Sequence, residues 1–444
     1  MTVGSPAKHI VAFSLPLIAG FLFQMLYNTV DTWVVGNFVS DEAFSAVGTV
    51  GPIINMLIGA FMGLSSGAGV VISQYFGAGD EKSVREAVHT SMVMTLVLGV
   101  LFTVIGIAYV PLMLRITKTP ANVFPESSAY LTIYFSGLMG LLVYNMGAAI
   151  LRAVGDSQRP FYYLVVSALT NIVLDLVFVL VFRMGVRGVA LATIIAQALS
   201  AVLAVIAMFR SNSCIRLELK MLKVNWSLLK KIFTVGIPTS LQQAVTSFSN
   251  VFVQSYINQF GSDCMGGWTA YAKIDQFALL PIQALTLAVT TFVGQNLGKG
   301  LVDRARRGIR TSLLLSLGVT VFCSGLLVIF APQLVGFFNS SPAIIDYGKL
   351  FLRWLTPFFL INAISQILSG ALRGAGNSTA PTVIMLLSFV AFRQVYLFIM
   401  SKFISNTILP IALGYPAGWI VCTALTWLYY RKTDITKYCV VKET

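Results

Sequence analysis

FYYLVVSALTNIVLDLVFVLVF, residues 161–182, is the stretch on which the interpretation of this chain depends. Its length and its nearly continuous apolar character predict a helix that crosses a membrane, because about 20 apolar residues suffice for that. Asn171 and Asp175 interrupt it, and residues four positions apart lie on one face of a helix. A carboxylate at the centre of a bilayer costs about 2.5–3.5 kcal/mol. The stretch therefore predicts a polar site inside a membrane protein.

The composition extends this interpretation to the whole chain. Its 444 residues are 57% hydrophobic and only 10% charged, whereas soluble domains have about 25% charged residues. The net charge of +14 comes from basic residues scattered between apolar runs, so no nucleic-acid partner is expected. The five cysteines have no disulfide or zinc spacing. With no phosphate-binding loop and no Ser/His/Asp arrangement, we expect neither an enzyme nor an organic cofactor.

Twelve apolar spans predict an all-α polytopic fold with twelve transmembrane helices. The basic residues concentrate in alternate loops, and the positive-inside rule then places both termini in the cytoplasm and the protein in the cell membrane. The spans are 10–36, 46–75, 89–114, 127–151, 161–183, 188–210, 232–260, 268–296, 311–334, 345–372, 381–403 and 415–430.

The chain repeats itself at a shift of about 221 residues. The segment from Gln74 to Gly79 matches that from Gln295 to Gly300, and Gly155 matches Gly376. Two halves of six spans insert the same way up, so they should be related by a pseudo-two-fold axis along the membrane normal. The predicted parts are an N-terminal lobe (1–210), a basic cytoplasmic linker (211–231), a C-terminal lobe (232–430) and a cytoplasmic tail (431–444).

The polar site belongs to the first half alone. The repeat places Val253 opposite Asp31 and Tyr396 opposite Asp175. Helical rise places Asp31, Asp175 and Thr193 at similar depths in the outer half of the bilayer, with Asn171 slightly deeper. Two carboxylates with neutral oxygens suit Na⁺, and two close carboxyl groups can instead hold a proton near neutral pH. The alternative is that each acid only forms hydrogen bonds that join packed helices.

Other polar residues predict the wall of a substrate cavity. In the first span, Gln24 and Asn28 share a stripe with Asp31; in the seventh, Gln243, Asn250 and Gln254 form another stripe. Asp275 either pairs with Arg393 or faces the cavity. Pro16 and Pro238 each remove one helix hydrogen bond, so they are candidate hinges or static kinks.

Taken together, these residues resemble the multidrug and toxic compound extrusion (MATE) transporters, in particular the prokaryotic DinF-like branch. The resemblance rests on Pro16 with Asp31, Asn171 with Asp175, Thr193, and the two paired glycine turns. It implies two six-helix lobes in a V, and export of cationic or amphipathic drugs in exchange for Na⁺ or H⁺. It further implies that Asp31, Asn171, Asp175 and Thr193 form the cation site, with Asn145 as a neighbour.

Some relatives also have an acid in the seventh span, where this chain has Asn250 and Gln254.

Two other functions stay open: a lipid-linked saccharide flippase of the wider superfamily and a non-transporting membrane protein. A flippase would favour a more cationic centre than Lys273 and Arg393 provide. The internal repeat favours a functional monomer.

Overall fold

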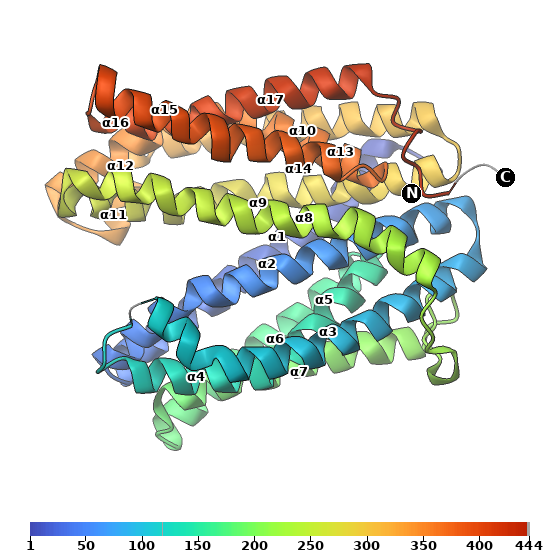
Figure 1. The fold of residues 1–444 in the computed structure, drawn as a ribbon, viewed down its shortest axis with the longest axis horizontal. Helices are drawn as coiled ribbons and strands as arrows, with labels where there is room; N and C mark the ends of the chain where they lie inside the picture. Colours follow the sequence, from blue (N-terminus) through green and yellow to red (C-terminus); the bar gives the residue numbers. More distant parts are fainter. Residues whose placement is uncertain (118, 442–444) are drawn as a thin grey trace. The chain divides into compact units, whose positions relative to one another are not determined.

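The computed structural model describes residues 1–117 and 119–441, and all regular elements among them are helices (Figure 1). This confirms the all-α membrane fold. In the first half the helices are α1 (Pro6–Phe38), α2 (Asp41–Ala78), α3 (Glu81–Ile116), α4 (Phe124–Ser136), α5 (Leu138–Ala153), α6 (Gln158–Leu176), the π-helix η1 (Val177–Val181) and α7 (Gly185–Phe209).

A linker containing the 3₁₀ turn η2 (Leu219–Met221) leads into the second half. The helices there are α8 (Trp226–Ile257), η3 (Asn258–Phe260), α9 (Ser262–Gly298), α10 (Val302–Ile329), α11 (Ala331–Phe338), α12 (Pro342–Leu355), η4 (Thr356–Phe358), α13 (Phe359–Gly374), α14 (Thr379–Leu386), η5 (Leu387–Phe392), α15 (Arg393–Ile399), η6 (Met400–Ile404), α16 (Ile408–Ala412) and α17 (Gly414–Lys432).

The helices are long enough for a membrane protein that crosses the bilayer many times. Among the described residues, ten helical segments are long and apolar enough to cross, and eleven if α4 and α5, which bend by 48°, count as one span. The seventh predicted span corresponds to α8, a helix of 32 residues that is not among those eleven.

The chain divides into two compact units whose boundaries fall inside helices. One unit comprises Leu15–Ile237, and the other comprises Met1–Ser14 together with Pro238–Thr444. The first boundary lies between Ser14 and Leu15, next to Pro16 in α1, and the second lies directly before Pro238 in α8; Pro16 and Pro238 are the two predicted hinges. The lobe, linker and tail boundaries given above stay a prediction, and residues 442–444 of the tail lie outside the described residues.

The internal repeat of the sequence is also a repeat of backbone conformation. The turn between α2 and α3 has Gly79 at φ 76°, and the turn between α9 and α10 has Gly300 at φ 74°. Gly155 and Gly376 also match in conformation, with φ angles of 97° and 96°. A positive φ favours glycine because it has no Cβ. The matched glycines therefore specify the same two turns in each half.

A buried polar contact holds α6 and α7 together in the unit 15–237. The Ser167 hydroxyl on α6 donates to the Ala196 carbonyl on α7 at 2.7 Å. The bend between α4 and α5 also fits against α7, because a Cβ on Gly137 would lie 2.3 Å from the Cβ of Ile194. Only glycine permits this approach, and Ile194 directly follows Thr193. These contacts fix α7 beside α6 and the bend.

The second half of the chain has an aromatic core of its own. Trp268 on α9 contacts Phe351 on α12 edge-on, with ring centroids 5.1 Å apart, and lies 5.4 Å from the ring of Tyr415. Trp268 and Phe351 are both buried.

Replacing Asp80 by alanine should destabilise the protein. Asp80 caps α3 and accepts a hydrogen bond from the Ser83 N–H at 3.0 Å, and hydrogen bonds from Ser83 hold the pKa of this carboxyl below its usual value. A cap of this kind is worth about 1 kcal/mol. We expect Asp80→Ala to lower the thermal midpoint of the purified protein at pH 7.

Because the lowered pKa favours the ionised form, the stabilisation is complete above the unfolded carboxyl's pKa. It is lost as the pH falls through the folded pKa, so the difference from wild type should narrow there. Asp80→Asn keeps a capping oxygen and is the matched control. Equal midpoints for wild type and Asp80→Ala at pH 7 would contradict this account of the cap.

Candidate functional site

The structure brings Asp31, Asp175 and Thr193 together inside the unit 15–237. The carboxyl of Asp31 on α1 lies within hydrogen-bonding reach of both the Asp175 carboxyl on α6 and the Thr193 hydroxyl on α7. Asp31 is 7% exposed, Asp175 is 0% exposed and Thr193 is 5% exposed. Three helices far apart in the sequence thus bring two carboxyl groups and a hydroxyl into one buried cluster.

The cluster has more acceptor oxygens than donors. Neither oxygen of Asp175 and neither polar atom of Asn171 has a hydrogen-bond partner, and Asp31 Oδ1 also lacks one. The Thr193 hydroxyl already donates to the Val189 carbonyl at 3.0 Å, so its proton is used there. Two carboxylates cannot bond each other unless one carries a proton. The buried cluster therefore leaves carboxylate oxygens without hydrogen-bond partners.

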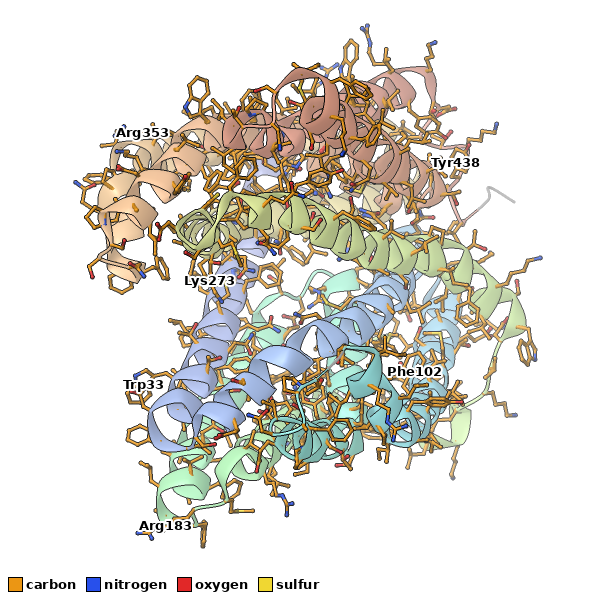
Figure 2. All side chains as sticks on the ribbon, turned by 60° about the vertical axis from the view of Figure 1, so that its left-hand side comes forward. Trp33, Phe102, Arg183, Lys273, Arg353 and Tyr438 are labelled. Carbon is orange, nitrogen blue, oxygen red and sulfur yellow. The ribbon has the colours of Figure 1, made fainter. Side chains whose placement is uncertain are left out.

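The local folds of α1, α6 and α7 explain how these side chains meet. Phe23 on α1 packs edge-on against Phe161 on α6, with ring centroids 6.1 Å apart. Asp175 lies two residues before the π-helix η1, a kind of local widening that is frequent at functional sites. The turn after η1 returns the chain to α7, with Arg183 at its tip (Figure 2).

Three buried or half-buried tyrosines interact electrostatically with the acids, and the sequence analysis did not identify them. Tyr130 and Tyr134 on α4 are stacked, with ring centroids 6.2 Å apart, and both interact electrostatically with Asp31. Tyr130 also interacts with Asp175, and Tyr27 on α1 interacts with Asp31. The i, i+4 spacing of Tyr130 and Tyr134 is the sequence signal that could have revealed this wall.

Asn145, Gln24 and Asn28 lie in the same unit but make other contacts. The Asn145 amide donates to the Leu141 carbonyl of its own helix at 2.9 Å. Gln24 forms a side-chain hydrogen bond with Tyr27. Gln24 and Asn28 are exposed, unlike the buried Asp31. Among the described residues, no hydrogen bond links Asn145 to either acid.

The polar residues predicted in the second half form a different environment. Asn250 accepts a hydrogen bond from the buried Arg393 at 3.0 Å, and Gln254 donates to Asn258, the first residue of η3, at 2.7 Å. Gln243 is exposed. These residues of α8 therefore do not converge on a single carboxyl group.

The proposed pairing of Asp275 with Arg393 is wrong. The described residues contain three ion pairs, and none includes either side chain. Arg393 donates instead to Ser249 and Asn250, and its guanidinium lies 4.8 Å from the centre of the Tyr415 ring. Asp275 is partly buried with Oδ1 unpartnered, while Lys273 is exposed (Figure 2).

No group of three or more His, Cys, Asp or Glu side chains gathers in the part of the chain that the structure describes.

Comparison with known proteins places the chain in a family. Duplicated helical halves and a one-sided acid cluster define a polytopic membrane protein with an internal polar site. The MatE family model matches residues 16–177 and 238–399, so the chain belongs to the MatE family. This confirms the resemblance predicted from the sequence.

Individual relatives cover nearly the whole chain. "Probable multidrug resistance protein YpnP" of Bacillus subtilis is 27% identical over 97% of this chain and 96% of its own length. "Probable multidrug resistance protein NorM" of Thermotoga maritima is 29% identical over 95% of this chain and 92% of its own length. The fold matches that of a MOP superfamily transporter from Pyrococcus furiosus, with a TM-score of 0.91, 23% identity and coverage of 96% of both chains.

Replacing Asp175 by asparagine should not destabilise the protein. The carboxyl is fully buried and has no donor, and removing an uncompensated buried charge is neutral or stabilising. We expect a thermal midpoint equal to or above that of wild type at pH 7, measured by unfolding of the purified protein.

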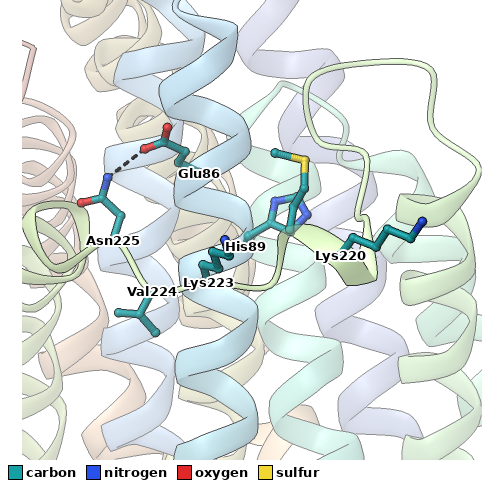
Figure 3. A pocket seen from close by; sticks show the side chains of 7 residues that line it. Glu86, His89, Lys220, Lys223, Val224 and Asn225 are labelled. Atoms are coloured by element: carbon teal, nitrogen blue, oxygen red, sulfur yellow. Dashed lines mark hydrogen bonds between the residues drawn. The ribbon is translucent and has the colours of Figure 1, made fainter.

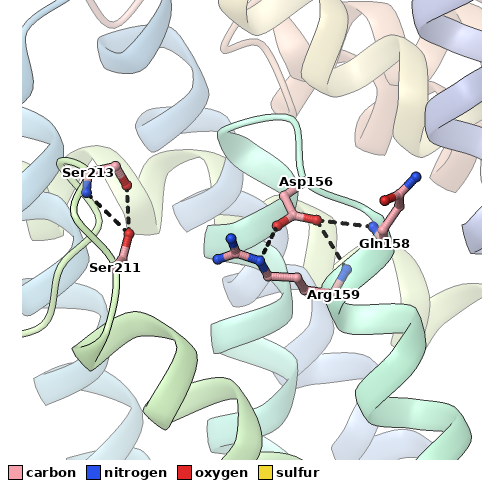
Figure 4. A network of polar contacts seen from close by, with 5 residues as sticks. All are labelled: Asp156, Gln158, Arg159, Ser211 and Ser213. Carbon is pink, nitrogen blue, oxygen red and sulfur yellow. Dashed lines mark hydrogen bonds and ion pairs between the residues drawn. The ribbon is translucent and has the colours of Figure 1, made fainter.

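Asp156→Ala is the contrasting variant. Asp156 accepts hydrogen bonds from the N–H groups of Gln158 and Arg159, both at 3.1 Å, and pairs with the Arg159 side chain at 3.2 Å (Figure 4). Its loss should cost about 1 kcal/mol. A large fall in midpoint for Asp175→Asn, matching that of Asp156→Ala, would mean that Asp175 is satisfied in the folded protein.

Proposed function

We propose that this protein is a secondary antiporter that exports cationic or amphipathic drugs in exchange for Na⁺ or H⁺. The observation that carries the proposal is the buried pair of Asp31 and Asp175, which lacks enough donors. A buried carboxylate without compensation is costly. A site of this kind gains stability whenever a proton or Na⁺ enters, so ion occupancy and protein conformation become coupled.

The chemistry of the site determines what each residue contributes. Asp31 and Asp175 supply charge, while Asn171 and Thr193 supply neutral oxygens that can replace part of the hydration shell of Na⁺. In the proton-coupled form, the two carboxyl groups hold one proton between them. The exposed Gln24 and Asn28 extend the polar face of α1 away from Asp31. Cargo and ion then compete for the same charged region, which produces exchange.

The cargo class is supported by the relatives. YpnP and NorM are named as probable multidrug resistance proteins, and MepA of Staphylococcus aureus, 23% identical over 90% of this chain, as a multidrug export protein. Tyrosine side chains beside carboxylates provide aromatic faces that attract organic cations. We propose such cations as the substrates of this chain too.

The setting of the transporter follows from the sequence. We propose that it acts as a monomer in the cell membrane with both termini in the cytoplasm, since the basic residues concentrate in the corresponding loops. Pro16 and Pro238 are proposed hinges, because each interrupts the hydrogen bonding of a long helix at a boundary between the compact units.

Ethidium efflux tests the coupling. In cells or proteoliposomes with imposed Na⁺ or proton gradients, wild type should expel ethidium faster under the gradient that drives it. Asp31→Asn and Asp175→Asn should reduce this gradient-driven efflux to the level of vector-only membranes, because an amide can neither exchange a proton nor neutralise a cation. The gradient that stimulates wild type identifies the coupling ion.

Asp346→Asn is the matched control. Asp346 is exposed and pairs only with Lys349, at 2.6 Å, so the same substitution there should leave efflux unchanged. If the double variant Asp31→Asn/Asp175→Asn kept full gradient-driven efflux, the acids would serve packing alone and the antiporter proposal would fail.

A further inference from the structure

The linker between the two halves is a fixed element of the unit 15–237. Three of its contacts go to α3. The Glu218 N–H donates to His89 Nε2 at 3.0 Å, the Asn225 N–H donates to Thr90 Oγ1 at 3.0 Å, and the Asn225 side chain donates to Glu86 at 2.8 Å. Thr90 is fully buried and His89 is 1% exposed. The linker is therefore held in one position along this helix.

A cavity of about 450 Å³ lies between the linker and α3 (Figure 3). Its walls include Glu86 and His89 on α3, and Lys220, Lys223 and Asn225 on the linker. This volume is in the range of small-molecule sites, about 300–1,000 Å³. The space can accommodate a ligand the size of a phospholipid headgroup.

The charged side chains that line the cavity are two lysines and one glutamate, so positive charge is in excess. Glu86 is engaged by Asn225, as the dashed line in Figure 3 marks. His89 bonds the Arg85 carbonyl through Nδ1 and accepts from Glu218 through Nε2, so it is a neutral spacer with both ring nitrogens in use. Lys220 and Lys223 are exposed, and neither takes part in an ion pair among the described residues. The two ammonium groups outnumber the single carboxylate of Glu86, which leaves an excess of positive charge for an anion.

Apolar side chains stand beside these lysines, exposed to the surroundings. Leu219 is 69% exposed, Met221 is 38% exposed, and Trp226 at the start of α8 is 77% exposed. Tryptophan is enriched at the interface of membranes with water, and lysine extends its stem along apolar surfaces with its charge in the headgroup layer. The combination matches a membrane interface and not bulk solvent.

We propose that the linker cavity binds an anionic phospholipid of the membrane around the protein. The lipid phosphate lies between Lys220 and Lys223, and Leu219, Met221 and Trp226 rest in the interfacial layer above the acyl chains. Basic residues beside a bilayer attract anionic lipids by about 1 kcal/mol each. The bound lipid joins the linker to α3, and this site is separate from the proposed coupling cluster.

Lipid binding by native mass spectrometry tests the proposal. The detergent-purified full chain is titrated with phosphatidylglycerol or with phosphatidylcholine of the same acyl chains. Wild type should bind phosphatidylglycerol more tightly. Lys220→Gln/Lys223→Gln should weaken phosphatidylglycerol binding about tenfold or more, because two attractive charges are lost, and should leave phosphatidylcholine binding unchanged.

Lys82→Gln/Lys299→Gln is the control of equal charge. Both lysines are exposed; Lys82 is the second residue of α3, Lys299 directly follows α9, and neither lines the cavity. Their replacement should leave phosphatidylglycerol binding at the wild-type level, and unchanged thermal midpoints verify that both double variants fold. If both double variants lost phosphatidylglycerol binding equally, the attraction would be nonspecific and the proposal would be overturned.

Two further outcomes also overturn it. Equal affinity of wild type for the two lipids would mean that the cavity does not recognise an anionic headgroup. Displacement of the lipid by inorganic phosphate at comparable concentration would assign the cavity to a small soluble anion. Because ethidium efflux is not measured, failure of this test leaves the proposed transport function untouched.

Discussion

The structure depends on one electrostatic constraint: two carboxyl groups are buried side by side, and three of their four oxygens have no hydrogen-bond partner. In water such groups would be solvated, but Asp31 and Asp175 are enclosed by helices and by tyrosine rings. Burying carboxylates without partners is costly, and in the function proposed above a proton or Na⁺ offsets that cost. The Ser167 contact and the close approach at Gly137 hold the enclosing helices in place and thereby maintain the constraint.

The internal repeat separates scaffold from site. The glycine turns recur with nearly identical φ values in the two halves, so they belong to the architecture that both halves need. The acids do not recur, since Val253 and Tyr396 occupy the matching positions. In the second half a buried arginine occupies the interior instead, held by Ser249 and Asn250 and facing aromatic rings. The repeated framework thus holds a pair of buried acids in the first half and a buried arginine in the second.

The sequence was sufficient to predict the helices, the repeat and the common depth of Asp31, Asp175 and Thr193. The helices follow from the apolar runs, the repeat from matching residues about 221 positions apart, and the common depth from helical rise. The tyrosine wall was not predicted, because Tyr130 comes from a helix whose rotation depends on the bend at Gly137. The π-helices were not predicted either, since no sequence pattern marks them. The supposed Asp275–Arg393 pair failed because proximity across helices cannot be calculated from opposite charge.

The positions of the unit boundaries have a consequence for dividing the chain. The stretch 211–225 between α7 and α8 is the obvious place to split the gene into two fragments. A break there would leave Trp226–Ile237 on the second polypeptide, although these residues belong with the first compact unit, and Met1–Ser14 on the first, although they belong with the second. The first fragment would carry Met1–Ser14, which belong to the second unit, and the second fragment would carry Trp226–Ile237, which belong to the first unit. Reassembly would therefore require each of these helix ends to pack into the other fragment's unit.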